Sequence, residues 1–457
     1  MDSLKTQTVR QIVLKSGKIK KFYLETLGCQ MNLADSELII SMLNDEGFIR
    51  SDNPYKSDLI LINTCSIREK AEEKVHSQLG RWHKIKKDKP EVIIGVLGCM
   101  AQNLKQDILD NKPYVDIILG PDSYRKLPMI IKRSYTDKKS IVDTKLSRFE
   151  VYEGLFPKRK DGVNAWISIM RGCDKFCTFC IVPFTRGRER SRSLESIVEE
   201  AENAVDSGYR ELTLLGQNVN SYNSGDHKFH NLLEVVSKIS GVDRIRYTSP
   251  HPQDITDELL DIMYKYDNIC NYIHLPLQAG SDKILKRMHR SYSKKDFLVL
   301  VEKIRLKLPN VGLSTDIIVG FPGETDNDFL ETIDVMNLVE FDSAFHFKYS
   351  PRNGTKATEF EDHISESIKQ RRLEKVISLQ KKHSIKRNQH LIGTTQNILV
   401  EKQSKMSSDY WAGRTDSNKW VIFKKGKVKI NEMVDVIITD SKGISLKGEL
   451  VSGAKAA

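Results

Sequence analysis

The stretch Arg171-Gly-Cys-Asp-Lys-Phe-Cys-Thr-Phe-Cys180 places Cys173, Cys177 and Cys180 within eight residues, directly after an apolar run at residues 165–170. The apolar run predicts a β-strand, and the cysteines predict a metal site on the loop that follows it. A structural zinc ion needs four protein ligands, and a [4Fe–4S] cluster usually takes four cysteines. Neither a fourth Cys nor a His lies nearby in the sequence, so we expect a cluster with one iron open to another ligand.

Strand-like and helix-like segments alternate downstream of this loop. Strands are expected at residues 165–170, 211–215, 244–248, 271–275, 312–319 and 343–349, and helices at 193–207, 231–239, 257–266, 281–308 (broken near Ser291) and 325–338. Six strands alternating with helices predict an α/β fold with a parallel barrel, complete or open, over residues 164–365. The cysteine loop then lies at the carboxyl-terminal mouth, where such barrels keep their catalytic residues.

Polar residues follow the later strands of this barrel. Gln217, Ser249, Gln278 and Gly320 each come just after a predicted strand. Singly each fits ordinary loop punctuation, but together at one rim they are candidates for binding a cofactor. Arg186, the first of four arginines at alternate positions after the cysteine loop, is a further candidate for a carboxylate or phosphates, with a solvated charged turn as the alternative.

A second set of cysteines lies in the N-terminal part of the chain, where strands are expected at residues 22–27, 59–64, 92–97 and 117–119. Helices are expected at about 32–46, capped by Asn32 or Asp35, and at 68–87. Cys29, Cys65 and Cys99 each follow a strand, at the edge where open α/β sheets bind ligands. We expect a second cluster with an open iron in a domain over residues 21–148; the alternative is that these cysteines are buried fillers.

The C-terminal part changes pattern after a strongly basic helical stretch at residues 366–390. Short strands are expected at residues 396–401, 410–415, 420–423, 433–438 and 445–450. Five such strands predict a small barrel of the oligonucleotide-binding kind over residues 391–455. Its aromatic and lysine residues are typical of nucleic-acid binders, although aromatics in a small barrel often form its core and a basic helix is often simply solvated.

Composition narrows the class of protein. The 457 residues carry a formal net charge of +11, which favours a polyanionic partner such as nucleic acid, with a merely soluble basic protein as the alternative. No apolar run approaches the length of a membrane span, and the basic tail at residues 1–20 has no apolar core of a signal peptide. Reduced thiols are therefore expected, and the seventh cysteine, Cys270, is interpreted as a buried filler. Residues 149–163 are predicted to be a linker.

These motifs resemble those of the radical S-adenosylmethionine (SAM) methylthiotransferase family. The C-x3-C-x2-C loop is similar to the radical SAM signature, the strings around Cys29, Cys65 and Cys99 resemble the family's N-terminal cluster domain, and the C-terminal barrel looks like its RNA-binding TRAM module. The resemblance implies a central (β/α)6 partial TIM barrel and a cytoplasmic transferase. It also implies two [4Fe–4S] clusters and SAM, used both as radical source and as methyl donor.

Within the family, the strings Cys29-Gln-Met-Asn32 and Asn63-Thr-Cys-Ser-Ile-Arg-Glu-Lys-Ala71 resemble the branch that acts on N6-dimethylallyladenosine at position 37 of tRNA. This implies that Cys173, Cys177 and Cys180 serve radical formation while Cys29, Cys65 and Cys99 hold the sulfur that goes to C2 of the base. Implied partners are the tRNA anticodon stem-loop, a one-electron reductant such as flavodoxin, and an unknown sulfur source. One departure is that the family's glycine-containing strand motif is present only as the string at residues 316–324.

Two alternatives remain open at this point. A ribosomal-protein substrate is possible within the same enzyme family, although that branch typically carries Cys-Pro-Lys-Asn where this chain has Cys-Gln-Met-Asn. A non-catalytic RNA-binding iron–sulfur or zinc protein would also explain the charge and the metal sites. It does not explain why both sites stop at three cysteines.

Overall fold

The computed structural model describes residues 20–65, 69–159, 162–441 and 443–451, and it divides into two units. The first comprises residues 1–160, 170–174 and 181–192; the second comprises 161–169, 175–180 and 193–457. The cysteine loop is therefore shared, with Cys173 in the first unit and Cys177 and Cys180 in the second. Of the predicted tail at 1–20, residues 1–19 lie outside the described residues, and the predicted domain boundaries stay predictions.

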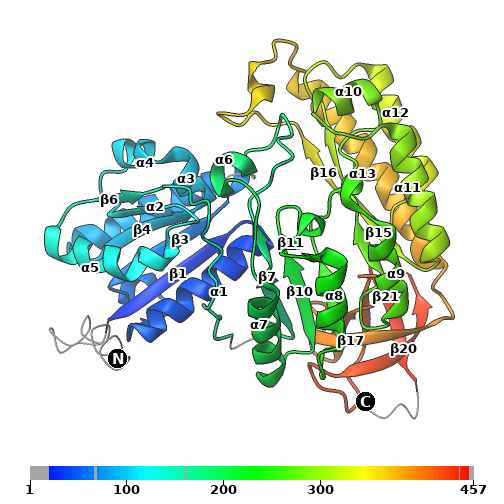
Figure 1. Cartoon of the computed structure of the whole chain (residues 1–457), viewed down its shortest axis with the longest axis horizontal. Coiled ribbons are helices and arrows are strands. Elements are labelled where there is room, and N and C mark those ends of the chain that lie inside the picture. The colour runs from blue at the N-terminus through cyan, green and yellow to red at the C-terminus, as the bar shows by residue number, and fades with distance from the viewer. Residues whose placement is uncertain (1–19, 66–68, 160–161, 442, 452–457) are drawn as a thin grey trace. The chain divides into compact units, whose positions relative to one another are not determined.

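A six-stranded parallel sheet forms the first unit (Figure 1), with the order β2-β1-β3-β4-β5-β6. Its strands are β1 (Lys21–Leu27), β2 (Ile49–Arg50), β3 (Leu59–Thr64), β4 (Ile93–Gly98), β5 (Ile117–Leu119) and β6 (Ile141–Asp143). Alternate residues of β3 enter two separate apolar clusters, with Leu59 and Leu61 in one and Ile60 and Ile62 in the other. The strand is therefore buried on both faces, as a continuous apolar run in a parallel sheet predicts.

Helices pack against the sheet and follow its strands along the chain. They are α1 (Gln30–Asp45), α2 (Glu69–Asp88), α3 (Cys99–Leu104), α4 (Gln106–Asn111) and α5 (Leu127–Asp137), with α6 (Val182–Arg186) and the strand pair β8 (Met170–Arg171) and β9 (Arg190–Ser191) added from the cysteine-loop region. The prediction that Asn32 or Asp35 caps the first helix is wrong, because α1 begins at Gln30 with Cys29 in the N-cap position. Asn32 instead bonds to Cys29 and Asn63, and Asp35 is buried in ion pairs.

An open parallel barrel forms the core of the second unit, which confirms the expected architecture. Its strands are β7 (Asn164–Ser168), β10 (Glu211–Leu215), β13 (Arg244–Tyr247), β14 (Tyr272–His274), β15 (Gly312–Val319) and β16 (Ser343–Lys348). They form two three-stranded parallel sheets, β13-β10-β7 and β14-β15-β16. A single parallel bridge between Ile245 and Ile269 joins the end of one sheet to the start of the other.

Helices separate the barrel strands as predicted. They are α7 (Leu194–Asp206), α8 (Phe229–Ser237), α9 (Asp257–Lys265), α10 (Asp282–Arg287), α11 (Lys294–Lys307) and α12 (Asp326–Val339). The expected break near Ser291 is confirmed, since α10 ends at Arg287 and α11 begins after the N-cap Ser293. Short segments β11 (Asn223–Ser224) and β12 (His227–Lys228) form a hairpin before α8.

The basic stretch forms α13 (Glu366–Gln389), which packs beside β16. A closed barrel follows, with the order β17-β18-β19-β21-β20, which confirms the small C-terminal barrel. Its strands are β17 (Thr395–Gln403), β18 (Tyr410–Arg414), β19 (Trp420–Lys424), β20 (Met433–Asp440) and β21 (Leu446–Leu450). No helix in the described part of the chain is long and apolar enough to cross a membrane.

Buried charges bind the small barrel to the amino-terminal ends of the large barrel's strands. Arg246 donates to the backbone carbonyls of Thr415 and Asp416 at 2.7 and 2.9 Å. Glu211 accepts from Arg246 at 2.9 Å and from Arg414 at 2.8 Å. The loop between β18 and β19 therefore covers the amino-terminal end of the open barrel.

Candidate active site

Cys29, Cys65 and Cys99 lie at the carboxyl ends of β1, β3 and β4, three adjacent strands of the first unit. The chain passes from β1 to β2 on one side and then to β3 on the other, so the sheet reverses its direction of growth between β1 and β3. Ligands of open α/β sheets bind at such switch points. Cys29 and Cys65 flank this point.

Two glycines allow the chain to approach closely at these strand ends. Gly28 and Gly98 have φ of +128° and +92°, in the range that favours glycine. A Cβ on Gly28 would lie 2.5 Å from the Cβ of Cys65, and one on Gly98 would lie 2.4 Å from Oδ1 of Asn63. The glycines therefore let the turn before Cys29 pack against Cys65, and the turn before Cys99 pack against Asn63.

The thiols of this set differ in environment. A hydrogen bond with the Cys65 thiol lowers the pKa of Cys29 to about 6, and the Cys29 thiol also donates to Oδ1 of Asn32 at 3.1 Å. Burial raises the pKa of Cys99, although the Arg186 guanidinium opposes this. The site thus contains thiols near each other and a buried positive charge near them.

Arg186 reaches this set from α6. Its Nε donates to Sγ of Cys99 at 3.2 Å, and its Nη2 donates to Oδ2 of Asp35 at 2.8 Å. Nη1 of Arg171 donates to the other carboxylate oxygen of Asp35 at 2.9 Å. Although burial raises the pKa of Asp35, the two guanidiniums outweigh it and the net shift is downward. The sequence offered Arg186 as a cofactor contact but did not indicate its burial beside Cys99.

Cys173 of the loop set is held within the first unit. Its N–H donates to the carbonyl of Gly187 at 3.2 Å. The preceding Gly172 has φ of +82°, and a Cβ there would lie 2.0 Å from the carbonyl oxygen of Arg188. Only glycine fits at this position, so the backbone before Cys173 is fixed against residues 187–188.

Cys177 and Cys180 are anchored within the second unit. The N–H of Cys180 donates to the carbonyl of Cys177 at 2.9 Å, which forms a tight turn between them. Thr178 donates through its N–H to Met288 and through its hydroxyl to Arg287, at 3.1 and 2.8 Å. Nη1 of Arg290 lies 3.5 Å from Sγ of Cys177, a positive neighbour for which the sequence carried no signal.

The predicted cofactor residues lie just beyond the ends of β10, β13, β14 and β15. Ser249 and Gln278 both adopt positive φ, of 59° and 69°. Oε1 of Gln278 is buried and has no hydrogen-bond partner among the described residues. Gly320 donates its N–H to Glu324 at 2.6 Å, and a Cβ on it would lie 2.3 Å from Cγ of Lys369. Gln217 follows β10 as predicted, whereas Arg186 belongs to the first unit.

A single metal ion and an iron–sulfur cluster require different arrangements of ligands. In the described residues, no group of three or more His, Cys, Asp or Glu side chains is arranged to hold a single metal ion. A [4Fe–4S] cluster is larger than one ion and is bound by thiolates that stand apart around it. Three thiols on neighbouring turns, with a buried guanidinium to offset negative charge, fit such a cluster at Cys29, Cys65 and Cys99.

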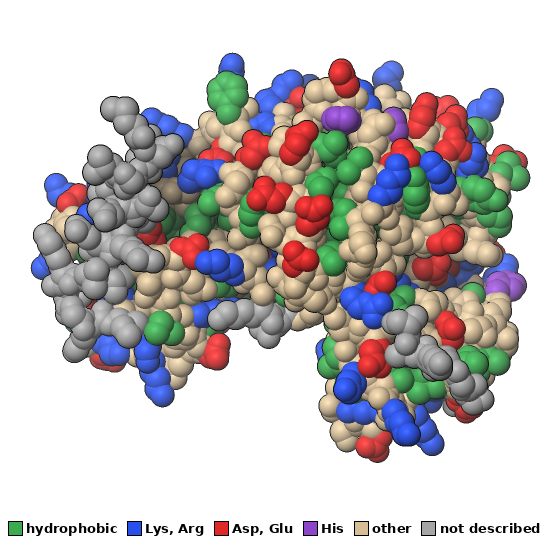
Figure 2. Space-filling model, turned by 60° about the horizontal axis from the view of Figure 1, so that its bottom comes forward, with side chains coloured by type: hydrophobic (Ala, Val, Ile, Leu, Met, Phe, Trp, Pro, Cys, Tyr) green, Lys and Arg blue, Asp and Glu red, His purple; other side chains and the backbone are tan. Residues whose placement is uncertain are grey.

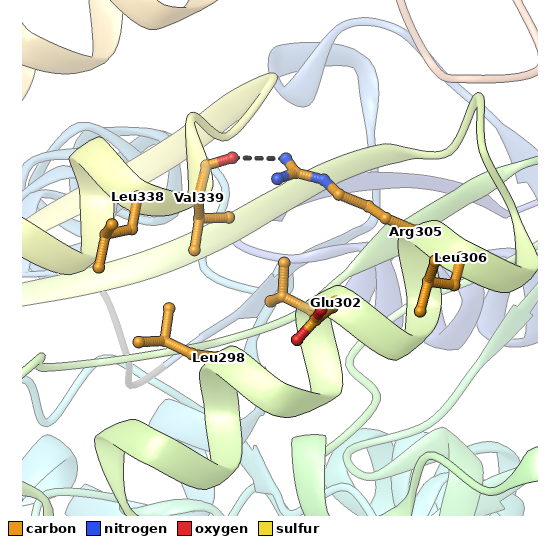
Figure 3. A pocket seen from close by; sticks show the side chains of 7 residues that line it. Leu298, Glu302, Arg305, Leu306, Leu338 and Val339 are labelled. Atoms are coloured by element: carbon orange, nitrogen blue, oxygen red, sulfur yellow. Dashed lines mark hydrogen bonds between the residues drawn. The ribbon is translucent and has the colours of Figure 1, made fainter.

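The outer surface of the large barrel carries a groove between α11 and α12, of about 310 Å³. Leu298, Leu306 and Leu338 line it, and Arg305 donates across it to the carbonyl of Val339 (Figure 3). None of the predicted site residues lines this groove.

Three family models match successive parts of the chain. Residues 21–120 match the uncharacterized protein family UPF0004, residues 167–336 the radical SAM superfamily, and residues 389–451 the TRAM domain. Among solved structures, the radical S-adenosylmethionine methyltransferase TsrM from Kitasatospora setae, with cobalamin and a [4Fe–4S] cluster bound, is 14% identical. It matches with a TM-score of 0.54 over 72% of this chain and 75% of that one. This likeness concerns the fold.

Curated relatives match almost the whole chain. A tRNA-2-methylthio-N(6)-dimethylallyladenosine synthase from Carboxydothermus hydrogenoformans is 46% identical over 94% of this chain and 99% of its own length. Proteins of the same name from Christiangramia forsetii and Bacteroides fragilis are 42% and 44% identical, each over at least 94% of both chains. The chain therefore belongs to the radical SAM family of tRNA-2-methylthio-N(6)-dimethylallyladenosine synthases.

Proposed function

We propose that this protein is a radical SAM enzyme that installs a methylthio group at C2 of N6-dimethylallyladenosine at position 37 of tRNA. One observation carries the proposal. Two sets of three cysteines, one at the switch point of an α/β sheet and one on the first loop of an open barrel, occur in a chain that matches synthases of this activity along its length.

Each set of cysteines has its own role in this proposal. Cys173, Cys177 and Cys180 would hold the [4Fe–4S] cluster that binds SAM, and Cys29, Cys65 and Cys99 would hold the one that carries the sulfur. When bound, these clusters supply electron transfer for radical formation from SAM and a site for sulfur methylation, chemistry that no side chain of the protein provides. The protein's own part is to bring the thiols together and to fix their loops, through Gly28, Gly98 and Thr178.

The residues around the barrel mouth support a SAM site to different degrees. The buried, unpartnered Oε1 of Gln278 is an acceptor available for the amino or hydroxyl groups of the cofactor. Ser249 is exposed and follows β13, the strand before the one that Gln278 follows. Gln217 is half-buried and follows β10. Gly320 has less room for a ligand, because the stem of Lys369 fills the space next to its Cα. We propose Gln217, Ser249 and Gln278 as the stronger candidates.

Cationic side chains of the C-terminal region support tRNA as the partner. Lys402 and Lys425 lie over the rings of Trp420 and Trp411, at 3.9 and 4.1 Å, so stacking surfaces and charge occur together. The face drawn in Figure 2 carries Lys and Arg interspersed with Asp and Glu, so there the net positive charge is not gathered in one patch. Binding to phosphates should weaken as salt rises.

The basic helix contributes less charge to such an interface than its composition indicates. Lys369 and Arg372 are buried, and Arg372 pairs with Glu324 at 2.6 Å and with Asp326 at 2.8 Å. The cations left for RNA are the exposed Arg371, Lys375, Lys381, Lys382 and Lys386, of which Lys386 pairs with Glu340.

The proposal includes the anticodon stem-loop and a reductant as partners, and the cytoplasm as the place where the protein acts. The anticodon stem-loop presents position 37 in a single-stranded loop, from which a base can be turned out into an active site. A one-electron reductant of the flavodoxin kind would serve the clusters, and the cytoplasm is where an enzyme of this activity meets tRNA.

The decisive experiment is a reaction with SAM and a reductant on tRNA that bears or lacks the dimethylallyl group, followed by nucleoside mass spectrometry. We expect the methylthio nucleoside only from the prenylated tRNA, and about eight irons per reconstituted chain. In Cys65→Ser we expect SAM cleavage to 5′-deoxyadenosine to continue while the methylthio product is lost. A reconstituted enzyme that forms no methylthio nucleoside on either tRNA contradicts the proposal.

A further inference from the structure

A buried ionic network lies beside the N-terminal cysteines. The side chains of Arg171, Arg186 and Asp35 are each no more than 3% exposed, and Asp35 accepts one hydrogen bond from each arginine. Arg171 also lies 3.8 Å from the buried Asp122, which pairs with the buried Arg190, so three guanidiniums face two carboxylates and the network keeps a net positive charge. Buried charges are costly unless something offsets them.

The donors of Arg186 show where an offsetting group would lie. Nη2 is taken by Asp35 and Nε by Sγ of Cys99. Nη1 is buried and has no hydrogen-bond partner among the described residues. Cys99 belongs to the N-terminal set, so the guanidinium is in direct contact with one thiol of that set. One donor is thus left over at the site where we place the cluster.

A thiolate-bound [4Fe–4S] cluster supplies what this guanidinium lacks. The cluster and its three thiolates carry net negative charge, and their sulfurs accept hydrogen bonds. A fixed positive charge and N–H donors near the sulfurs favour the reduced, more negative form and so raise the reduction potential. Partners of this kind also hold the ligands in place and contribute to metal affinity.

We propose that Arg186 is a positioning residue of the N-terminal cluster, which compensates its charge and donates to its sulfurs, and that Asp35 aims the Arg186 side chain. This inference rests on the proposed assignment of Cys29, Cys65 and Cys99 as cluster ligands. It differs from the role of Arg186 expected from the sequence, a cofactor contact that binds a carboxylate or phosphates.

Asp35 also connects the two cysteine sets, because it accepts hydrogen bonds from an arginine near each of them. The second arginine on Asp35, Arg171, precedes Cys173 by two positions, and the Gly172 between them is fixed by close packing. Asp35 therefore fixes the side chain that contacts Cys99 and the strand that leads to Cys173.

The test uses the full chain with Cys173→Ala, Cys177→Ala and Cys180→Ala, so that only the N-terminal cluster is loaded. Its midpoint potential is measured by a redox titration followed by EPR, and its iron loss is timed with a chelator. In this background Arg186→Gln should shift the potential to a more negative value and speed iron loss roughly tenfold or more. Arg186→Lys keeps the charge but not the planar guanidinium. The potential of the cluster in this variant should therefore lie between those of the parent and of Arg186→Gln.

Arg190→Gln is the matched control. Arg190 is also a buried arginine of the same segment and pairs with Asp122 at 2.9 Å, but it donates to oxygen atoms of the described residues and not to a cysteine. It should lower the melting temperature with a much smaller shift in potential than Arg186→Gln. Asp35→Asn should speed iron loss, because Arg186 loses its anchor, whereas the loss of the negative charge of Asp35 acts on the potential in the direction opposite to Arg186→Gln.

The outcomes separate this inference from the proposed function. If the triple cysteine variant takes up no cluster at all, the assignment of Cys29, Cys65 and Cys99 fails. If it takes up a cluster whose potential is the same with Arg186→Gln as without it, only the role of Arg186 is overturned. Equal shifts for Arg186→Gln and Arg190→Gln would also overturn it, since a general loss of buried charge would then be the cause.

Discussion

Cys29, Cys65 and Cys99 come from three strand ends, each more than thirty residues from the next, whereas Cys173, Cys177 and Cys180 lie within eight residues of one loop. Cys65 and Cys99 are buried and Cys29 is half-buried, while all three loop cysteines are half-buried. The first set exists only when a whole sheet has folded. The second set needs only that its loop be anchored, and it keeps access to a small molecule such as SAM.

This difference also separates the surroundings of the two sets. The sheet set lies beside a carboxylate shared by two buried arginines, and its glycines allow close packing of the turns. The loop set is held by backbone hydrogen bonds and by one arginine near Cys177. Changes at the sheet set should therefore act through folding and packing, and changes at the loop set through ligand loss.

The largest effect is expected from removing one loop ligand. Cys177→Ala should lower iron from about eight to about four per chain and abolish both 5′-deoxyadenosine and the methylthio product. Iron analysis and product assays on the same preparation check this. The control is Cys270→Ala, a buried cysteine outside both sets, which should keep full iron. Retained SAM cleavage in Cys177→Ala would break the distinction between the sets.

A packing change should disable the sheet set alone. Gly98→Ala would place a Cβ 2.4 Å from Asn63 and 2.6 Å from the carbonyl of Thr64, and it also costs roughly 1–3 kcal/mol in backbone strain. We expect about half of the iron to be lost and the methylthio product to fall at least tenfold, with SAM cleavage retained.

Gly208→Ala provides the matched comparison for Gly98→Ala. Gly208 has almost the same φ, +91°, but nothing lies within 4 Å of an added Cβ. It should lose stability without losing iron. If both variants lose iron equally, strain and not the packed cysteine turns explains the effect.

A smaller effect should appear in the pH dependence of stability near the loop set. Burial, helped by Arg290 and Lys175, lowers the pKa of His251 to about 2, from an ordinary value of 6.5. The unfolded chain therefore binds a proton below about pH 6.5 that the folded protein does not. This costs up to about 1.4 kcal/mol of stability per pH unit as the pH falls.

His251→Asn removes this proton and keeps a side-chain acceptor for the N–H of Gln253. Denaturant unfolding of the cluster-free protein between pH 7 and 5 should therefore give a shallower loss of stability for the variant than for the parent. Parallel curves for the two proteins would show that His251 is protonated in the folded state.

The smallest effect is expected in the small C-terminal barrel. Lys425→Gln should reduce the slope of log tRNA affinity against log salt by about one, because one phosphate contact is lost. Lys303→Gln on α11, where the lysine pairs with Asp257, is the control and should leave the slope unchanged. Binding at several salt concentrations is the measurement, and an unaltered slope in Lys425→Gln would remove this lysine from the tRNA interface.

Much of the fold followed from local pattern. The bounds of β3, β10 and β15 agree with those expected from their apolar runs, because strands buried on both faces have few polar interruptions. The short edge strands β2 and β6 were not expected, since two or three residues carry no recognisable period.

The candidate site was predictable in its cysteines but not in its supporting residues. Cys29, Cys65 and Cys99 repeat one position in three strand–helix units, which is a signal in the sequence. Arg186 was expected only as a cofactor contact and Asp35 only as a helix cap. Their burial beside Cys99 gave no signal, because a charged residue is expected at the surface and only the folded chain brings α6 beside α3. Their burial depends on a contact between segments about 150 residues apart.

The loop between β18 and β19 covers the amino-terminal end of the open barrel. The small C-terminal barrel is therefore a structural part of the large barrel. Cutting the chain after α13 would leave Glu211 and Arg246 without Arg414 and the carbonyls of residues 415–416, and these charges would then face solvent from a core built to exclude it. A truncated enzyme that loses activity would therefore report a damaged barrel as readily as lost RNA binding. Point substitutions on the small barrel's outer lysines are the way to separate the two.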